Sequence, residues 1–143
     1  AIGKATLVMD MCLEYVRQRQ QFNASLGDFQ LIQKMLADSA IEINACRISL
    51  WQIASRIDAG DEMRAGISML KIQASEMLDR VVDRAVQIFG GAGYCTDLPI
   101  ERYYRDARIS RIYDGTSEIH RVVIAKELIN GNTSLYDSHG KLQ

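Results

Sequence analysis

Apolar residues recur every seven positions along residues 28–59, at Leu36, Ile43, Leu50 and Ile57. A seven-residue apolar repeat is typical of a long helix that packs along a bundle. At ~1.5 Å per residue, a helix over this range is ~45 Å long. We expect it to be the longest helix or nearly so, with the four repeat residues buried together.

The rest of the chain predicts further helices, because its apolar residues step by three or four and Pro99 is the only proline. Short loops join the first three helices, which predicts antiparallel neighbours. The fold class is therefore all-α, an up-and-down four-helix bundle with an additional C-terminal helix. The expected helices cover residues 1–20, 28–59, 61–89, 99–112 and 116–131.

Residue types at the expected helix ends support these boundaries. Glycines follow three of the ends, at Gly60, Gly90 and Gly131, and glycine adopts the left-handed conformation there without steric cost. Asp61 is expected to cap the third helix. We expect one domain over residues 1–131. Residues 132–143 are polar without an apolar period, which predicts a frayed or disordered tail.

Composition narrows the classes of function. The formal net charge is −1, and no apolar run approaches the ~20 residues that a membrane helix needs. We therefore expect no nucleic-acid partner and no membrane span. The three cysteines are widely spaced, which is typical of reduced thiols in a bacterial cytoplasm or a mitochondrial matrix. The two histidines lack metal-ligand spacing, so no metal is expected. Because the chain opens within an apolar pattern and without methionine, we expect it to be a piece of a larger protein.

Two glycine-containing turns lie at expected helix ends, where backbone N–H groups lack partners and anions bind. The first turn, at residues 90–93, is either a helix C-cap or a place where a ligand approaches the backbone closely. The second turn contains Asp114 beside Gly115. Asp114 is either the N-cap of the last helix or a carboxylate base at the mouth of a pocket.

Arginines are the other residues with two interpretations. A row at three-residue spacing is either an ion-paired face or a stripe that binds nucleic acid, and the net charge does not support the second. Arg19, at the end of the first helix, either complements the helix dipole or reaches a phosphate. The residues of the row are Arg102, Arg105, Arg108 and Arg111.

Several segments combine into a specific pattern: Arg19-Gln-Gln-Phe22, Gln30, Gln87-Ile-Phe-Gly-Gly-Ala-Gly-Tyr94, Pro99-Ile-Glu-Arg102, Arg105-Asp-Ala-Arg108 and Ile112-Tyr-Asp-Gly-Thr-Ser-Glu-Ile-His-Arg121. In this order and spacing, up to about residue 131, the chain resembles the C-terminal helical domain of the acyl-CoA dehydrogenases. The joint match carries the resemblance, rather than any single motif.

The resemblance implies a flavoprotein that oxidises an acyl-CoA thioester to 2,3-enoyl-CoA. A carboxylate removes the α proton, and N5 of FAD accepts hydride from the β carbon. In the family an all-α domain and a β domain precede this one, so the isolated chain is expected to be inactive. The resemblance also implies a homo-oligomer, a dimer or tetramer that shares FAD across a subunit boundary, and electron-transfer flavoprotein or another acceptor. The alternatives are a helical oligomerisation module without chemistry and a related flavoprotein oxidase acting on nitroalkanes or acyl-CoA.

The resemblance further implies roles for residues near the first turn. Arg19, Gln21 and Phe22 match positions that contact the FAD of the neighbouring subunit. Contacts to the adenosine and pyrophosphate of that same FAD are matched by Gln30, Gln87, Gly90 and Gly91.

Around the second turn, the resemblance implies a substrate site. Thr116 and Glu118 match contacts to the subunit's own FAD, and Tyr113 and Gly115 match positions that line the acyl thioester. Asp114 matches the position of the catalytic glutamate in many members. Aspartate is one methylene shorter than glutamate, which alters the reach of a base that must come within hydrogen-bond distance. Some relatives use aspartate here, and in others the base lies upstream of this chain.

Overall fold

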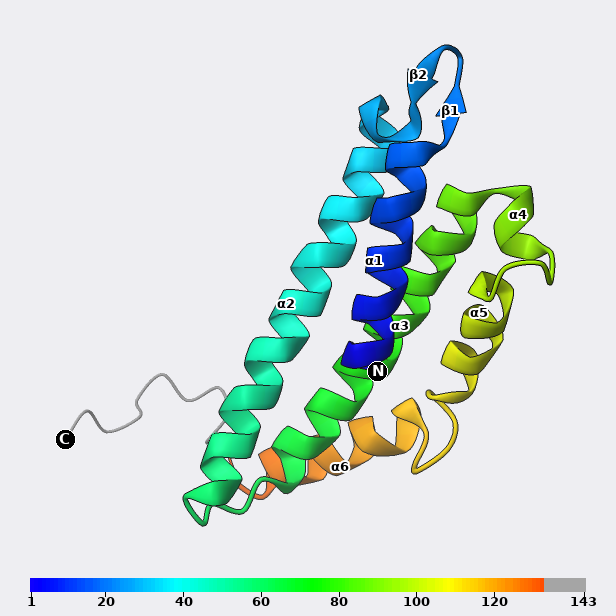
Figure 1. Ribbon diagram of the computed structural model, residues 1–143. Helices are drawn as coiled ribbons and strands as arrows, with labels where there is room; N and C mark the ends of the chain where they lie inside the picture. Colours follow the sequence, from blue (N-terminus) through cyan, green and yellow to red (C-terminus); the bar gives the residue numbers. More distant parts are fainter. Residues whose placement is uncertain (133–143) are drawn as a thin grey trace.

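Helix α3 (Arg64–Phe89) is the central element of the bundle, and the five other described α-helices pack against it. The computed structural model describes residues 1–132. In Figure 1, α1 and α2 lie on one side of α3, and α5 lies on the other side. Two ion pairs, Arg121–Glu76 and Arg64–Glu127, place α6 along the N-terminal half of α3. The other helices are α1 (Ile2–Gln18), α2 (Gln30–Asp58), the single turn α4 (Gly91–Tyr94), α5 (Ile100–Ile109) and α6 (Ser117–Ile129).

The predicted all-α bundle is confirmed. Helix α2 is the longest described helix, with 29 residues. The chain reverses direction after α1 and again after α2, so α1, α2 and α3 run antiparallel, as the short loops predict (Figure 1). None of the helices within residues 1–132 combines the length and apolar character that crossing a membrane requires. Residues 133–143, which make up nearly all of the expected tail, lie outside the described residues.

The core forms where α1, α2 and α3 face one another. Burying one large aliphatic side chain stabilises the fold by roughly 1.5–3 kcal/mol, so this row of side chains dominates the packing energy. Burial also raises the pKa of Cys12 to about 12, which keeps this thiol neutral within the core. The core side chains from the three helices are Ala5, Val8, Cys12, Val16, Ile43, Cys46, Met77, Leu78, Val81, Val82, Ala85, Ile88 and Phe89.

The predicted burial of the seven-residue repeat in α2 is wrong for its C-terminal half. Ile43 is buried, but Leu50 is 39% exposed and Ile57 is 45% exposed. A helix turns once every 3.6 residues, so a strict seven-residue spacing drifts by ~20° per repeat around the helix. In addition, this chain's α1 lies beside the N-terminal part of α2 and not beside its C-terminal part (Figure 1). The residues of α2 that are buried are Ser39, Ile43, Cys46 and Ile53.

Residues 19–29 contain ordered structure that the sequence pattern did not predict. Strand β1 (Gln20–Gln21) pairs antiparallel with β2 (Ala24–Ser25), and the short 3-10 helix η1 (Leu26–Asp28) follows. The backbone N–H of Leu26 donates to the carbonyl of Arg19 at 2.9 Å. Because these backbone groups pair within the hairpin, α1 ends at Gln18 rather than 20 and α2 begins at Gln30 rather than 28.

Gly60 ends α2 as predicted, with φ +91°. Its N–H donates to the carbonyl of Ile57, and the N–H of Asp61 donates to that of Arg56, which is the Schellman pattern of helix ends. The prediction that Asp61 caps α3 is wrong, because the capping position is Met63 and carries no side-chain hydrogen bond. Instead, the Asp61 carboxylate accepts a 2.8 Å hydrogen bond from Nε of Arg56.

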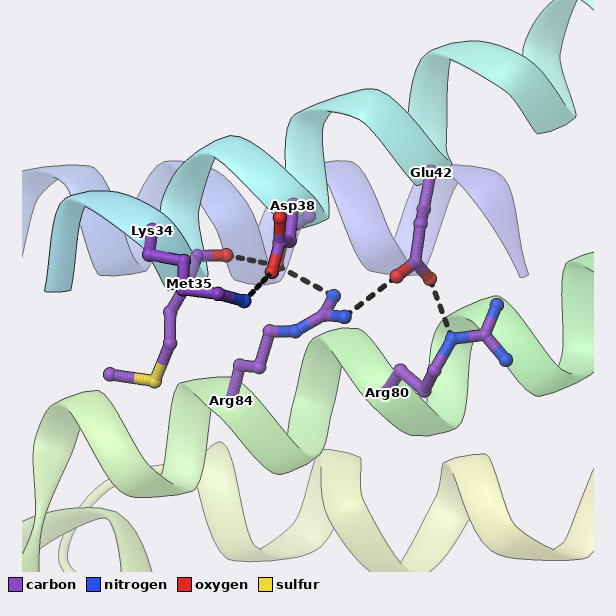
Figure 2. Close-up of polar contacts among 7 residues, drawn as sticks. Lys34, Met35, Asp38, Glu42, Arg80 and Arg84 are labelled. Carbon is purple, nitrogen blue, oxygen red and sulfur yellow. Dashed lines mark hydrogen bonds and ion pairs between the residues drawn. The ribbon is translucent and has the colours of Figure 1, made fainter. Parts of the chain in front are cut away.

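A polar seam fixes the register between α2 and α3 (Figure 2). The carboxylate of Glu42 accepts from Arg80 Nε at 2.7 Å and from Arg84 Nη2 at 2.6 Å. Nη1 of Arg84 also donates to Ser39 Oγ at 3.3 Å. Both Glu42 and Arg84 are mostly buried. Water therefore competes less for their hydrogen bonds than for those of the exposed Lys34–Asp38 pair beside them.

Candidate active site

The connection between α5 and α6 places Asp114 in an unusual backbone conformation. Asp114 has φ +54° and Gly115 has φ +87°. Among residues with a Cβ, asparagine and aspartate tolerate the left-handed region best. The N-cap of α6 is Thr116, whose Oγ1 accepts from the N–H of Ile119 at 3.2 Å. The alternative in which Asp114 caps the last helix is therefore wrong, and its carboxylate is free of that structural task.

Side chains from α3 and α6 hold this turn. Nζ of Lys71 donates to the carbonyl of Gly115 at 2.6 Å. Nε2 of His120 lies 3.1 Å from the carbonyl oxygen of Asp114, and Nδ1 of the same ring lies 3.1 Å from Oγ of Ser68. Ser68 is buried on α3. The turn is thus tied to the central helix at two successive carbonyl groups.

A cleft of about 320 Å³ lies against this turn. Tyr113 and Asp114 line it from the turn, Lys71 lines it from α3, and Ala1 and Lys4 line it from the start of α1. Half of Tyr113 is exposed, so its ring is available to a ligand. The start of α1 and Asp114 therefore border the same space, which means that a base could reach this cleft from either element.

The hairpin after α1 presents a second group of the expected site residues. Arg19 is the C-cap of α1 and is exposed. Phe22 and Asn23 have φ +53° and +62°, which is typical of a two-residue type I′ turn. Phe22 is 89% exposed, and a bulky residue with positive φ is rare. An aromatic ring held outward at a conformational cost is a candidate contact for a ligand.

The end of α3 lies beside the end of α1. The rings of Tyr15 and Phe89 stack at 4.1 Å between centroids, which joins the two helix ends. A Cβ added at Gly90 or at Gly91 would meet nothing within 4 Å, so both backbones are open to a ligand. At Gly93 a Cβ would lie only 2.7 Å from Cβ of Phe89, so this glycine is required for the packing of α4 on α3.

Most of the arginine row on α5 is ion-paired. Arg105 pairs with Glu101 at 2.8 Å, and Arg102 approaches Asp106 at 4.0 Å. Arg111 pairs with Asp79 at 3.2 Å and has a buried Nε without a hydrogen-bond partner. These pairs support the ion-paired interpretation of the row over a nucleic-acid stripe.

Residues 1–129 match the family model for the acyl-CoA dehydrogenase C-terminal domain. The chain belongs to the acyl-CoA dehydrogenase family. This confirms the resemblance carried by the six segments, and the family is one of FAD-dependent oxidoreductases.

Curated relatives and solved structures agree with this family. A probable acyl-CoA dehydrogenase of Mycobacterium tuberculosis is 42% identical over 130 residues, which cover 90% of this chain and 33% of the relative. The human mitochondrial short-chain specific acyl-CoA dehydrogenase is 41% identical over 134 residues, covering 94% and 32%. A structure of PigA with FAD superposes with a TM-score of 0.85 at 31% identity, covering 89% of this chain and 33% of that one. The chain thus spans about a third of the length of these relatives.

Within this acyl-CoA dehydrogenase domain, the expected site residues fall into two separate groups. The hairpin, the start of α2 and the end of α3 form one group, which we call the hairpin group. The α5–α6 turn and the start of α6 form the other, which we call the turn group, and Figure 1 shows that the two lie apart along the bundle. The hairpin group contains Arg19, Gln21, Phe22, Gln30, Gln87, Gly90 and Gly91, and the turn group contains Tyr113, Asp114, Gly115, Thr116 and Glu118.

Glu118 in the turn group is held as an anion at the start of α6. Hydrogen bonds from its own backbone N–H and from the Thr116 hydroxyl keep the pKa of the Glu118 carboxyl below its usual value. Its carboxylate therefore accepts from one backbone N–H at the start of the helix, that of Glu118 itself. In the described residues, no three His, Cys, Asp or Glu side chains are grouped to hold a metal ion.

Sequence reasoning missed the residues that hold the turn. Lys71 and Ser68 lie 44 and 52 positions away from their partners Gly115 and His120, so no local pattern connects them. Lys71 is a charged residue beside the apolar positions of α3, and this position was the feature of the sequence that could have indicated a contact with the turn. His120 was part of a matched segment, but nothing in its neighbours indicated a contact with Asp114.

Proposed function

We propose that the chain is the C-terminal domain of a flavoprotein dehydrogenase that oxidises an acyl-CoA thioester to 2,3-enoyl-CoA. The observation that carries the proposal is the Asp114 turn, because a carboxylate relieved of helix capping lies at a cleft whose wall also includes Tyr113. Membership of the family supports the substrate class. Since the chain covers a third of its relatives, the activity would belong to a longer protein, and the chain alone would be inactive.

In this proposal Asp114 is the general base that removes the α proton of the thioester. FAD, when bound, supplies the acceptor for hydride from the β carbon. Asp114 has a left-handed backbone conformation. The His120 ring occupies the space beside Gly115 where a Cβ would lie, so Gly115 would meet the thioester through its backbone. The side chain of Tyr113 would contact the acyl group and help to exclude water from the base.

The exposed groups fit FAD. Among residues 1–132 the exposed guanidinium of Arg19 forms no ion pair, so it is available to a pyrophosphate, and Phe22 offers an exposed ring. Gly90 and Gly91 leave the backbone open for close approach. Gln21, Gln30 and Gln87 add amide donors and acceptors at the same end of the bundle. At the turn group, Thr116 and Glu118 would contact a second FAD.

Two FAD contacts at separated places imply a second copy of the protein. The hairpin group of one subunit would complete the FAD site of its neighbour, and the turn group would contact the subunit's own FAD. A homo-oligomer, a dimer or tetramer, follows from this arrangement. Electron-transfer flavoprotein or another acceptor would reoxidise the flavin. Bacterial and mitochondrial relatives support a bacterial cytoplasm or a mitochondrial matrix as the location.

Replacing Asp114 with asparagine in the complete protein tests the base. Asparagine tolerates the left-handed backbone almost as well as aspartate, and the α6 cap is Thr116, so folding and flavin content should stay close to wild type. The rate of flavin reduction by acyl-CoA thioesters in rapid mixing should fall by roughly 10²- to 10⁴-fold.

Asp97→Asn is the matched control, because Asp97 is exposed and does not line the cleft. It should leave the reduction rate unchanged. A wild-type rate in Asp114→Asn would assign the base to another carboxylate on the same cleft, upstream of Ala1. If neither variant nor wild type reduces its flavin with any thioester of a chain-length panel, the dehydrogenase proposal itself fails.

A further inference from the structure

The hydrogen bonds around His120 fix which ring nitrogen carries the proton. A backbone carbonyl can only accept, so the contact between Nε2 and the Asp114 oxygen requires an N–H at Nε2. In the neutral ring Nδ1 then has a lone pair, and the hydroxyl of Ser68 donates to it. A directed chain therefore runs from the buried hydroxyl of Ser68 through the imidazole to the Asp114 carbonyl.

The turn is built to receive this ring. A Cβ at Gly115 would lie 2.9 Å from Nε2 of His120, so the imidazole packs directly on the glycine backbone. From α3, Nζ of Lys71 donates to the next carbonyl, that of Gly115, at 2.6 Å. The positive φ of Asp114 has a conformational cost that surrounding contacts must offset, whereas Gly115 adopts its positive φ without that cost. These contacts act on the backbone carbonyls and leave the Asp114 side chain to face the cleft.

Helix capping does not explain these contacts. Thr116 already satisfies the N–H of Ile119 at the start of α6, and the contacts of His120 and Lys71 reach carbonyls outside the helix. Packing does not explain them either, because a polar ring and a lysine amine contribute little to an apolar core. The contacts have one effect in common: they hold the backbone conformation of the candidate base, Asp114, and of its neighbour Gly115.

We propose that Ser68, His120 and Lys71 form a positioning unit that sets the direction in which the Asp114 carboxylate enters the cleft. This inference rests on the proposed function, in which Asp114 is the base. None of the three residues is itself the base. Each acts through the backbone of the turn, and misplacing a catalytic group by about 1 Å can cost up to ~100-fold in rate.

Two substitutions separate the contacts of the ring. The amide nitrogen of glutamine lies at about the distance of Nε2, so His120→Gln can still donate to the Asp114 carbonyl. The amide of asparagine lies at about the distance of Nδ1, so His120→Asn can keep Ser68 but cannot reach the turn. We expect flavin reduction in the complete protein to fall about 10-fold or more in His120→Asn, with the substrate KM little changed, and to recover largely in His120→Gln.

Loss in both variants with a matching drop in melting temperature would assign His120 a purely structural role and overturn the proposal. Wild-type reduction in His120→Asn would also overturn it. Lys71→Met should lower the rate in the same direction, because it removes the donor to the Gly115 carbonyl and keeps the length of the side chain.

A measurement independent of turnover keeps this inference separate from the proposed function. The ¹⁵N shifts of the His120 imidazole should identify the Nε2–H tautomer, with His139, the other histidine in the sequence, replaced by glutamine for assignment. Ser68→Ala should alter the Nδ1 shift. An Nδ1–H tautomer would overturn the positioning unit even if Asp114 is the base. If the tautomer is as expected but Asp114→Asn reduces flavin normally, then the proposed base fails while the geometry of the unit holds.

Discussion

Three consecutive residues of the α5–α6 turn meet three different backbone requirements. Asp114 accepts a left-handed conformation, Gly115 accepts another while the His120 ring lies against it, and Thr116 caps α6. The identity of each residue thus follows from its own place in the turn. This division of tasks leaves the Asp114 carboxylate free to act on a ligand.

Substituting alanine for Gly115 tests how tightly the turn is packed. The new Cβ would meet Nε2 of His120 at 2.9 Å, and φ is +87°. We expect the free energy of unfolding to fall by about 1–2 kcal/mol in urea titrations. Gly3→Ala is the control, since Gly3 lies in α1 with nothing within 4 Å, and it should gain roughly 0.5–1 kcal/mol. Equal effects of the two changes would contradict the close approach at the turn.

Replacing Arg19 with alanine tests the hairpin group. If Arg19 binds the FAD pyrophosphate as proposed, this change in the complete protein removes a charge-assisted contact, and FAD binding should weaken by ~1.5–3 kcal/mol in an equilibrium titration. Arg17→Ala is the control, because Arg17 is also an exposed charge in the last turn of α1. If the two variants bind FAD equally well, the charge acts only on the helix dipole.

At the scale of whole elements, helices could be predicted from the sequence because apolar spacing and glycine punctuation act locally. Gly60 ended α2 where expected, with the Schellman hydrogen bonds. The hairpin at residues 20–25 could not be predicted, because its strands are two residues each and carry no alternation. The exposure of Leu50 could not be predicted either, since it depends on which part of α2 the other helices cover.

The seam between α2 and α3 was also invisible in the sequence, because Glu42 and its partners Arg80 and Arg84 are about 40 residues apart. Glu42→Ala would leave Arg84, which is mostly buried, without its carboxylate. We expect a loss of about 1.5–3 kcal/mol in the free energy of unfolding. Asp38→Ala, which breaks the exposed Lys34 pair on the same helix, should change stability little. A similar loss in both variants would show that burial does not strengthen the Glu42 cluster.

At the scale of the whole molecule, we propose that a second chain completes the site. The sequence motifs singled out the expected site residues, and two of them, Tyr113 and Asp114, line one cleft. Their relation to the hairpin group could not be predicted, because it depends on the lengths and directions of helices. The structure sets the two groups apart along the bundle (Figure 1), which supports the proposal that they contact different FAD molecules.

The outer face of α2 is the surface on which we expect a second copy to pack. Ile41, Ile48 and Trp51 are each more than half exposed on α2, with Trp51 at 65%. Such spacing places them on one side of the helix. Apolar side chains grouped in this way mark a surface for association.

Trp51 is the only tryptophan, so its emission reports directly on this surface. If copies associate through α2, the emission should shift to shorter wavelength as the protein concentration rises, because the indole leaves water. Trp51→Glu should weaken association by about 30-fold or more, since tryptophans at interface centres contribute 2 kcal/mol or more. Sedimentation measures this directly. Gln52→Glu, an exposed change on a different side of the same turn, should leave association unaltered. A monomer at all concentrations, with emission that does not move, would mean that α2 meets another part of the protein or solvent, and the shared FAD site would need a different pairing of subunits.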